Sequence, residues 1–335
     1  MNLSYQKMVD LASSGLQAAG IGQKAAHETA QFLALAELDG LASHGLARVS
    51  QYAGHAKNGR IELSPKIKVR PFKTSAALVD ACDGLAFPAL RFATDLSVNL
   101  ASKTGVGLVA VTNSHHFGVA GHFAEAAARA GYISLLFGNT PAAMPMVGGS
   151  KALFGTNPLA AAFPVANRDP MVIDMSLSAV ARGKLLVAAK KGESIPEGWA
   201  LTAEGKPTTD PNEGLKGLMV PLGGDKGALL ALIVELLVVG LSGSRFSYEA
   251  DSFFDAKGNR PRIGQLLLTI DPGLAGSQMF ASKIQEFLKI LASDSGTRVP
   301  GQRRFKQRAS GFQEGVNVSD VVIEEIQTGI SQSWS

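Results

Sequence analysis

"VGLVAVTNSHHFGVAGHFAEAAARAGYISLLFGNT", residues 106–140, is the stretch of this sequence that decides its fold. An apolar, valine-rich run from Gly107 to Val111 predicts a buried strand, and a polar loop with two histidines follows it. An alanine-rich run from about Val119 to Ala130 predicts a helix, and a second strand is expected from Tyr132 to Phe137. A strand, loop, helix and strand in this order predict an α/β protein.

The segments on either side of this stretch extend the α/β pattern. Short apolar runs bounded by turn residues predict further strands, at residues 76–84, 158–165, 170–176 and 262–272. Apolar residues at helical spacing predict helices, at residues 4–38 with a break near 18–23, 88–105 and 277–294. The apolar run 227–240 predicts a buried helix, and the Gly-, Pro- and Thr-rich run 194–211 predicts a loop.

Helices at both ends of the chain therefore enclose a mixed α/β middle. We expect a mixed central sheet in residues 71–274, which would form the catalytic region. Residues 1–70 are expected to form a helical segment that packs with residues 275–335.

Composition limits the class of protein. The chain has 335 residues, 46% of them hydrophobic, which is enough for a large core. The single cysteine, Cys82, fits a reducing compartment, and no apolar run reaches the roughly 18 to 20 residues of a membrane span, so a cytoplasmic protein is expected. The net charge of +4 and the scattered basic residues argue against nucleic-acid binding. The one basic run, 297–308, predicts either a solvated loop or a site for a small anion.

Three of the six histidines lie close together in "NSHHFGVAGHF", residues 113–123. A metal site is not favoured, because no HExxH motif or cysteine ligand accompanies them. His115 and His116 lie between a strand and a helix N-terminus, where a side chain faces ligands and anions are attracted, although both could simply cap the helix. His122 falls inside the helix and is expected to pack.

No ordinary nucleotide-binding motif is present. Neither G-x-G-x-x-G after a strand nor G-x-x-x-x-G-K-[ST] occurs, so a Rossmann or P-loop protein is disfavoured. "PLGGDKGALLAL", residues 221–232, instead places Asp225 and Lys226 at the start of an apolar helix. Free amides there could hold a phosphate, or Asp225 could be a simple N-cap.

"DGLASHGLAR", residues 39–48, places Ser43, His44 and Arg48 within six positions. No G-x-S-x-G elbow supports a hydrolase. Arg48 follows His44 by four residues, so one helix would present both on one face. An arginine beside a histidine suits the binding of a carboxylate next to a proton transfer, although a surface pair would look the same.

Together these motifs resemble the malate/L-lactate dehydrogenase family of the non-Rossmann type, which includes sulfolactate dehydrogenases and Δ1-piperideine-2-carboxylate/Δ1-pyrroline-2-carboxylate reductases. The matching stretches are "DGLASHGLAR", residues 106–140, "LFGTNPLAAAFP", "VIDMSLSAVARGK", "GKPTTDP" and "GGDKG". The resemblance implies a non-Rossmann NAD(P)-binding fold with a mixed sheet, and a homodimer with the active site near the subunit interface. It also implies hydride transfer between a nicotinamide and the α-carbon of a small carboxylic acid.

The resemblance also implies roles for particular residues. His44 would donate or relay a proton with Ser43 as its hydrogen-bond partner, and His116 would lie near the nicotinamide and share this transfer. Arg48 would bind the substrate carboxylate with help from Thr156. The cofactor would contact His115, His116, Phe117, Gly118, Asp174, Met175, Ser176, Asp225 and Lys226. Arg303 and Arg304 are placed to bind a 2′-phosphate, which favours NADPH over NADH.

Within the family, residues 221–237, 245–251 and 264–272 resemble the cyclic-imine reductases. The sequence therefore predicts an NAD(P)H-dependent reductase of Δ1-pyrroline-2-carboxylate or Δ1-piperideine-2-carboxylate. Two residues depart from that branch: Lys184 stands where those reductases tend to have a relay aspartate, as in malate and lactate members, and Asp225 replaces a histidine. The alternatives are a malate- or lactate-type dehydrogenase acting on a 2-oxo acid, and a relative that binds NAD(P) without turnover.

Overall fold

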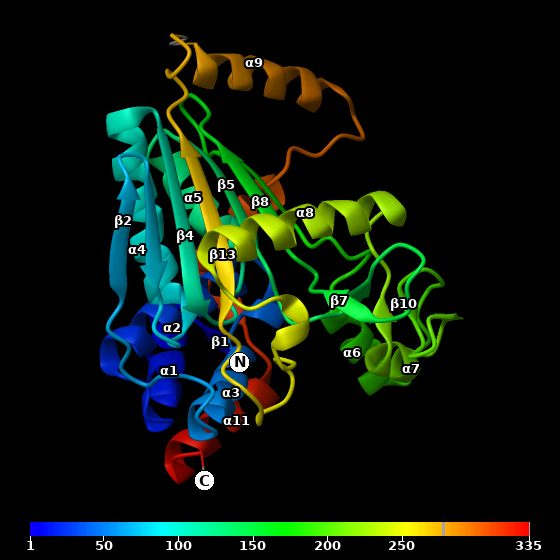
Figure 1. The fold of residues 1–335 in the computed structure, drawn as a ribbon. Coiled ribbons are helices and arrows are strands. Elements are labelled where there is room, and N and C mark those ends of the chain that lie inside the picture. The colour runs from blue at the N-terminus through cyan, green and yellow to red at the C-terminus, as the bar shows by residue number, and fades with distance from the viewer. Residues whose placement is uncertain (277–278, 335) are drawn as a thin grey trace.

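A seven-stranded mixed sheet forms the centre of the protein. The structure, a computed structural model, describes residues 1–276 and 279–334. The strand order is β2-β3-β4-β13-β5-β8-β9, in which β3 and β4 run parallel and the other neighbours are antiparallel (Figure 1). The strands are β2 (Lys68–Lys73), β3 (Ala76–Asp80), β4 (Val106–Ser114), β5 (Ile133–Gly138), β8 (Leu159–Phe163), β9 (Met171–Met175) and β13 (Ile263–Ile270).

Helices cover both faces of this sheet. In β4, Val109 and Val111 contribute to the core shared with α4 (Ala86–Thr104) and α5 (Ala120–Arg129). Leu108 and Ala110 lie in a second core that contains α8 (Asp225–Ser242). This alternation follows from the two-residue period of a strand, and it makes the molecule three layers deep.

The chain termini meet at one end of the sheet (Figure 1). β1 (Asn2–Leu3) pairs with β14 (Val316–Asn317), α1 (Tyr5–Ala18) packs on α11 (Asp320–Gln332), and α2 (Gln23–Leu38) packs on α10 (Gln302–Glu314). α9 (Phe280–Ser293) departs from this arrangement, because its Leu288 packs on Val165 and Val299 near the opposite end. The division into residues 1–70 with 275–335 and 71–274 stays a prediction.

Of the remaining elements, the helix Arg48–Lys57 packs on α1 and α11, and most of the others form a small lobe (Figure 1). The remaining elements are α3 (Arg48–Lys57), α6 (Arg182–Lys191), α7 (Pro211–Lys216), 3₁₀ turns at Ala42–His44 and Ser247–Glu249, and short strands β6 (Met144–Pro145), β7 (Ala152–Phe154), β10 (Ala200–Leu201), β11 (Pro207–Thr208) and β12 (Leu218–Met219). No helix within the described residues is long and apolar enough to cross a membrane.

The prediction for one segment, and one of the two alternatives for another, were wrong about burial. The helix at residues 227–240 is not wholly buried: within α8, Val234 and Val238 are buried whereas Ile233 and Leu236 are exposed. The basic run 297–308 is not a solvated loop, because its second half begins α10 and its Arg308 is largely buried on acidic side chains. Neither outcome is visible in composition alone, since each depends on what packs against the helix.

Candidate active site

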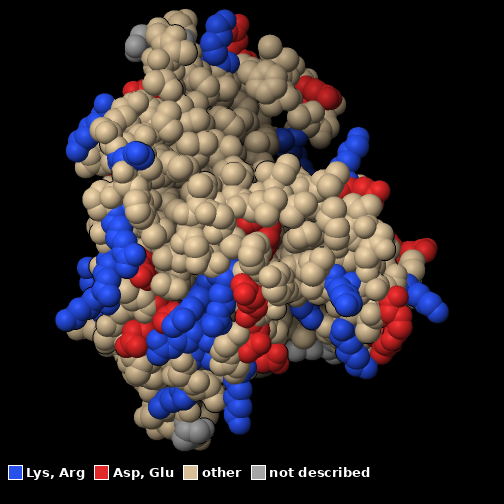
Figure 2. Space-filling model, viewed as in Figure 1, with Lys and Arg blue, Asp and Glu red and all other residues tan. Residues whose placement is uncertain are grey.

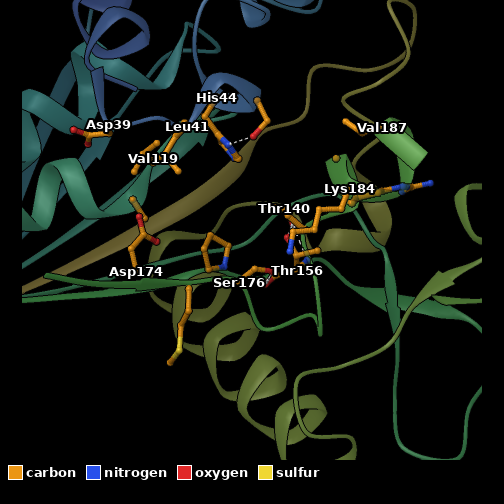
Figure 3. A pocket seen from close by; sticks show the side chains of 18 of the residues that line it. Asp39, Leu41, His44, Val119, Thr140, Thr156, Asp174, Ser176, Lys184 and Val187 are labelled. Atoms are coloured by element: carbon orange, nitrogen blue, oxygen red, sulfur yellow. Dashed lines mark hydrogen bonds between the residues drawn. The ribbon is translucent and has the colours of Figure 1, made fainter. Parts of the chain in front are cut away.

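A single large cavity of about 1640 Å³ collects most of the predicted site residues. Its wall comes from the 3₁₀ turn at Ala42–His44, the loop before α5, the end of β9 and the start of α6 (Figure 3). The connection between α9 and α10 also lines it. The predicted residues that line it are Ser43, His44, Arg48, His116, Phe117, Gly118, Thr156, Asp174, Met175, Ser176, Arg303 and Arg304.

Three predicted residues do not line this cavity. His115 is buried behind it, where its Nε2 lies 3.0 Å from Nδ1 of His55. Asp225 and Lys226 are exposed at the start of α8 and are absent from the cavity lining. Their roles toward a cofactor stay predictions. The three clustered histidines diverge, since His116 pairs with Tyr52 and His122 with Asp39.

The turn that carries His44 is fixed by a buried carboxylate. Glu37 accepts a hydrogen bond from the Leu46 N–H at 2.8 Å. Gly45 lies against the same side chain, and a Cβ at this position would come within 2.2 Å of a Glu37 oxygen. Any residue larger than glycine would therefore push the turn away from Glu37.

This turn also corrects the predicted geometry of His44 and Arg48. The two residues do not share a helix, because His44 ends the 3₁₀ turn and Arg48 begins α3. They are brought together by a different contact, in which Arg48 Nε donates to the Ser43 carbonyl at 2.7 Å. The predicted proximity is therefore present, but the turn at Gly45 produces it rather than an i,i+4 spacing.

His44 is a neutral base at the edge of the cavity. Its Nδ1 lies 3.0 Å from Ser43 Oγ. Burial, and after it the charge of Arg48, lowers the pKa of His44 to about 4. An anionic ligand beside Arg48 would offset that charge and make the protonated form easier to reach, which suits a residue that exchanges protons with a bound acid.

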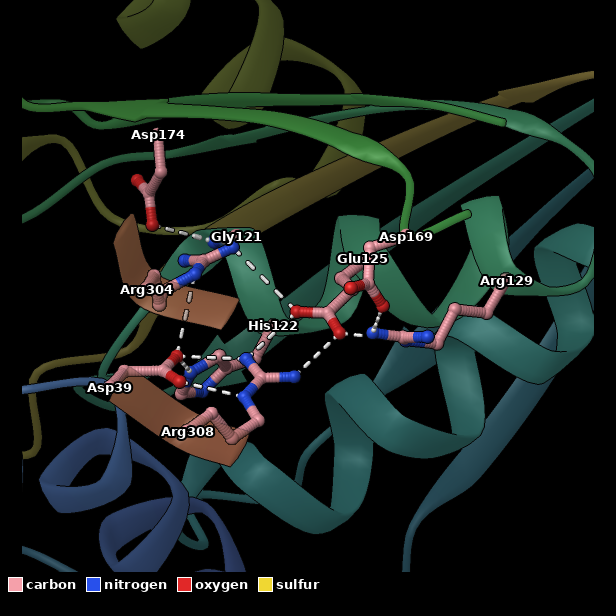
Figure 4. Close-up of polar contacts among 9 residues, drawn as sticks. All are labelled: Asp39, Gly121, His122, Glu125, Arg129, Asp169, Asp174, Arg304 and Arg308. Atoms are coloured by element: carbon pink, nitrogen blue, oxygen red, sulfur yellow. Dashed lines mark hydrogen bonds and ion pairs between the residues drawn. The ribbon is translucent and has the colours of Figure 1, made fainter. Parts of the chain in front are cut away.

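Arg304 borders the cavity on the side of the predicted cofactor residues. Its Nε lies 3.4 Å from Asp39, its Nη2 lies 3.6 Å from Glu125, and both nitrogens are buried without a hydrogen bond. Nearby, Asp174 accepts a hydrogen bond from the Gly121 N–H at the start of α5 (Figure 4). A Cβ at Gly121 would come within 2.9 Å of both Asp174 and Arg304, so the close approach requires glycine.

Arg308 neutralises the acids that Arg304 only approaches. Its guanidinium donates to both oxygens of Asp39 at 2.7 and 2.8 Å and to both oxygens of Glu125 at 2.6 and 2.9 Å (Figure 4). Burial alone would raise the pKa of Asp39, but the hydrogen bonds from Arg308 and His122 outweigh it and keep the pKa below its usual value. The network ties α10 to α5 and to the end of α2.

Two cations at the cavity and a phenol behind it were not predicted as site residues. Arg182 and Lys184 line the cavity, and Lys184 reaches toward Thr140 and Thr156 (Figure 3). Tyr52 contacts His116 from behind. A signal existed for Tyr52, which follows Arg48 by four residues and so lies on the same face of α3.

Comparison with known proteins places this site in a family. The family model described as malate/L-lactate dehydrogenase matches residues 3–327. The chain belongs to the malate/L-lactate dehydrogenase family. Members of this family similar to the chain are named dehydrogenases or reductases, which confirms the predicted oxidoreductase class.

Three family members show the range of similarity. The (2R)-3-sulfolactate dehydrogenase (NADP(+)) of Chromohalobacter salexigens is 43% identical over 97% of each chain. A Δ1-pyrroline-2-carboxylate/Δ1-piperideine-2-carboxylate reductase of Pseudomonas putida is 35% identical over 98% of this chain and 96% of its own. The crystal structure of the Δ1-piperideine-2-carboxylate reductase of Pseudomonas syringae superposes with a TM-score of 0.93 at 34% identity, over 98% of this chain and 99% of the other.

Proposed function

We propose that the chain transfers hydride between NADPH and the α-carbon of a small carboxylic acid. One observation carries this proposal: Arg48, His44 and His116 open onto the same cavity. Arg48 would hold the carboxylate and orient the α-carbon, while His44 exchanges the proton that accompanies hydride transfer. Thr156, which lines the same wall, would assist Arg48.

The residues present fit a phosphorylated dinucleotide. The cavity exceeds the roughly 300–1,000 Å³ of sites for drug-sized ligands, which leaves room for a dinucleotide beside a small acid. Arg303 and Arg304 border it, and a guanidinium can bind a phosphate through paired hydrogen bonds. NADPH would supply the hydride. The name of the sulfolactate relative specifies NADP(+), which supports NADPH over NADH. The non-Rossmann mode of binding and a cytoplasmic location stay predictions.

The cations of the cavity favour a substrate with two negative charges. Besides Arg48, the cavity contains Lys184 and Arg182, and the buried Nε of Arg182 has no hydrogen-bond partner among the described residues. A 2-oxo acid with a second carboxylate or a sulfonate would use Arg48 at one end and Lys184 at the other. We therefore propose a 2-oxo acid reductase and 2-hydroxy acid dehydrogenase of this type as the first candidate.

The cyclic imines predicted from the sequence form the second candidate. It is favoured by the relatives at 34–35% identity that are named for Δ1-pyrroline-2-carboxylate and Δ1-piperideine-2-carboxylate. These substrates carry one carboxylate, so they would use Arg48 and leave Lys184 without a charged partner. NADPH oxidation at 340 nm with both imines, 3-sulfopyruvate, oxaloacetate and pyruvate, repeated with NADH, separates the candidates. Binding of NADPH with no turnover of any acid would instead indicate an inactive relative.

Replacing Lys184 with methionine tests the second charge. We expect KM for 3-sulfopyruvate or oxaloacetate to rise about tenfold, because one charge-assisted contact is lost, while KM for pyruvate changes less than about twofold. Steady-state kinetics with the three acids measures the difference. Lys206→Met, on an exposed lysine of the turn between β10 and β11, is the matched control. An equal rise of KM for all three acids would contradict a second anion site.

We also propose that the homodimer implied by the family uses the outer face of α8. Leu229, Ile233, Leu236 and Leu241 are each about half exposed, at 48%, 53%, 55% and 52%. The first three lie three or four residues apart and so share one side of the helix, and Leu241 follows near its end. Figure 2 shows few charged side chains in this region. An apolar stripe of this kind on a water-soluble surface marks a contact with another protein, here a second copy.

Ile233→Glu is expected to give a monomer, since it places a charge in the centre of that stripe. Light scattering after gel filtration would then report about 35 kDa for the variant, against twice that mass for the unmodified protein. Val321→Glu, at a more exposed apolar residue on α11, should leave the dimer intact. A dimeric Ile233→Glu protein would place the interface elsewhere.

A further inference from the structure

Tyr52 is a buried phenol whose hydroxyl has one hydrogen-bond partner within the described residues, a histidine of the cavity wall. Its hydroxyl lies 2.6 Å from Nδ1 of His116, and the backbone N–H of Gly118 approaches the same nitrogen at 3.4 Å. The side chain of Tyr52 is wholly enclosed. Phe253 contacts the His116 ring edge-on at 5.3 Å between ring centroids and holds it from another side.

In both hydrogen bonds at Nδ1, His116 is the acceptor. A backbone N–H can only donate, so Nδ1 of His116 offers its lone pair to Gly118. Burial raises the pKa of the Tyr52 hydroxyl, so the phenol keeps its proton. The buried hydroxyl has no other acceptor within the described residues, so this proton is donated to Nδ1 of His116. With Nδ1 occupied as an acceptor, the single proton of the neutral ring lies on Nε2. Within residues 1–276 and 279–334, Nε2 has no hydrogen-bond partner, and the ring lines the cavity.

We propose that Tyr52 is a positioning residue that holds His116 in the Nε2–H tautomer, so that His116 offers the bound acid a hydrogen-bond donor. This inference rests on the proposed function, since it assigns the donor to an oxygen of the acid at the reacting carbon. Its physical basis is the geometry at Nδ1, which a neighbour 64 residues away in the sequence provides.

The surroundings of His116 keep it neutral. The groups that face it are Tyr52, His44, Arg48, His115 and His55, none of which carries a negative charge. Burial, and then the charge of Arg48, holds the pKa of His116 well below its usual value. A neutral ring with its proton on Nε2 polarises a carbonyl without losing that proton.

His44 differs from His116 in this respect. Its Nδ1 partner is the hydroxyl of Ser43, which can rotate to donate or to accept. Either protonation state of His44 is therefore satisfied, whereas protonation of His116 at Nδ1 would oppose the Gly118 N–H. When hydride adds to the carbonyl carbon, the carbonyl oxygen takes up a proton and becomes a hydroxyl. This proton comes by way of His44, and His116 keeps the proton on its Nε2.

Nitrogen-15 NMR of histidine-labelled protein tests the tautomer directly. A difference spectrum against His116→Gln identifies the two ring nitrogens of His116. We expect an unprotonated, pyridine-like signal for Nδ1 and a protonated signal for Nε2 between pH 6 and 8. The opposite assignment, or an imidazolium in this range, would overturn the inference. This measurement needs no substrate, so it does not depend on the proposed function.

Tyr52→Phe removes only the hydroxyl. We expect Nδ1 and Nε2 of His116 to show averaged signals, and kcat to fall about tenfold, the factor for one hydrogen bond, with KM for NADPH within about twofold. Tyr5→Phe, which removes a phenol hydroxyl bonded to the Gln31 carbonyl, is the matched control and should change neither readout. Unchanged His116 signals in a folded Tyr52→Phe protein would refute the role of Tyr52. The signals could average in Tyr52→Phe while even the unmodified protein turns over none of the acids tested. That result would refute the proposed function and leave the role of Tyr52 standing.

Discussion

Replacing His44 with alanine is expected to lower kcat by about 10²- to 10⁴-fold, the usual contribution of a positioned proton donor. The reason is its place in the cavity, where Ser43 orients the ring at 3.0 Å and no other histidine there is free to change protonation state. The dissociation constant for NADPH should stay within about twofold, because the arginines proposed to bind its phosphate belong to α10 and not to the turn that carries His44. Stopped-flow absorbance at 340 nm and NADPH fluorescence titration measure the two quantities.

The pH profile supplies an independent check on His44. Since its pKa is about 4, the residue is neutral and able to accept a proton at every pH above about 5. We therefore expect kcat/KM for hydroxy-acid oxidation to show no limb near 6.5, the pKa of an ordinary histidine. His27→Ala, at an exposed histidine on α2, serves as the control. If the His44→Ala protein retains a tenth of the activity, a residue other than His44 exchanges the proton.

The sequence was enough to predict the strands of the fold, but not which strands pair with each other. The runs at residues 107–111, 132–137 and 262–272 predicted three strands, because buried strands need apolar side chains on both faces. That β13 lies between β4 and β5 depends on pairing residues more than 120 positions apart, which no local pattern encodes.

The site was predictable in part for a similar reason. Ser43, His44, Arg48 and His116 lie in short motifs, and the structure brings all four to one cavity. His115 was assigned with its neighbour, but adjacent residues in a loop point apart, and His55 from α3 takes its side chain into the core. The spacing from Arg48 indicated the helix face of Tyr52 but not its partner. The contact with His116 depends on how α3 packs beside the loop before α5.

The basic run at residues 297–308 shows how burial changes the meaning of a charge. Composition suggested that this run contacts either solvent or a small anion. In the structure its arginines differ: Arg303 is exposed at the cavity, whereas Arg308 is 88% buried on Asp39 and Glu125. The acids come from α2 and α5, so the partners of Arg308 lie more than 180 residues away in the chain. Its role is therefore structural, and it can be tested as such.

Replacing Arg308 with methionine is expected to destabilise the protein by about 3–5 kcal/mol, because two buried carboxylates lose the cation that donates hydrogen bonds to both. Methionine keeps much of the side-chain volume, so packing changes little. Urea unfolding followed by circular dichroism gives the free energy of unfolding at pH 7. Arg129→Met is the matched control, since Arg129 also pairs with Glu125 but is about half exposed, and the loss there should stay below about 1 kcal/mol.

The pH dependence of this difference distinguishes lost ion pairs from lost packing. Arg308 lowers the pKa of Asp39 and Glu125 below their ordinary values of 3.8 and 4.5. A carboxylate with a lowered pKa stabilises the fold fully above its ordinary pKa, and this contribution is lost as the pH falls through the lowered value. The gap between the unmodified protein and Arg308→Met should therefore be largest at pH 6–7 and shrink below about pH 4. A gap that is constant with pH would mean that Arg308 acts through packing, and the carboxylates of α2 and α5 would then need another source of charge balance.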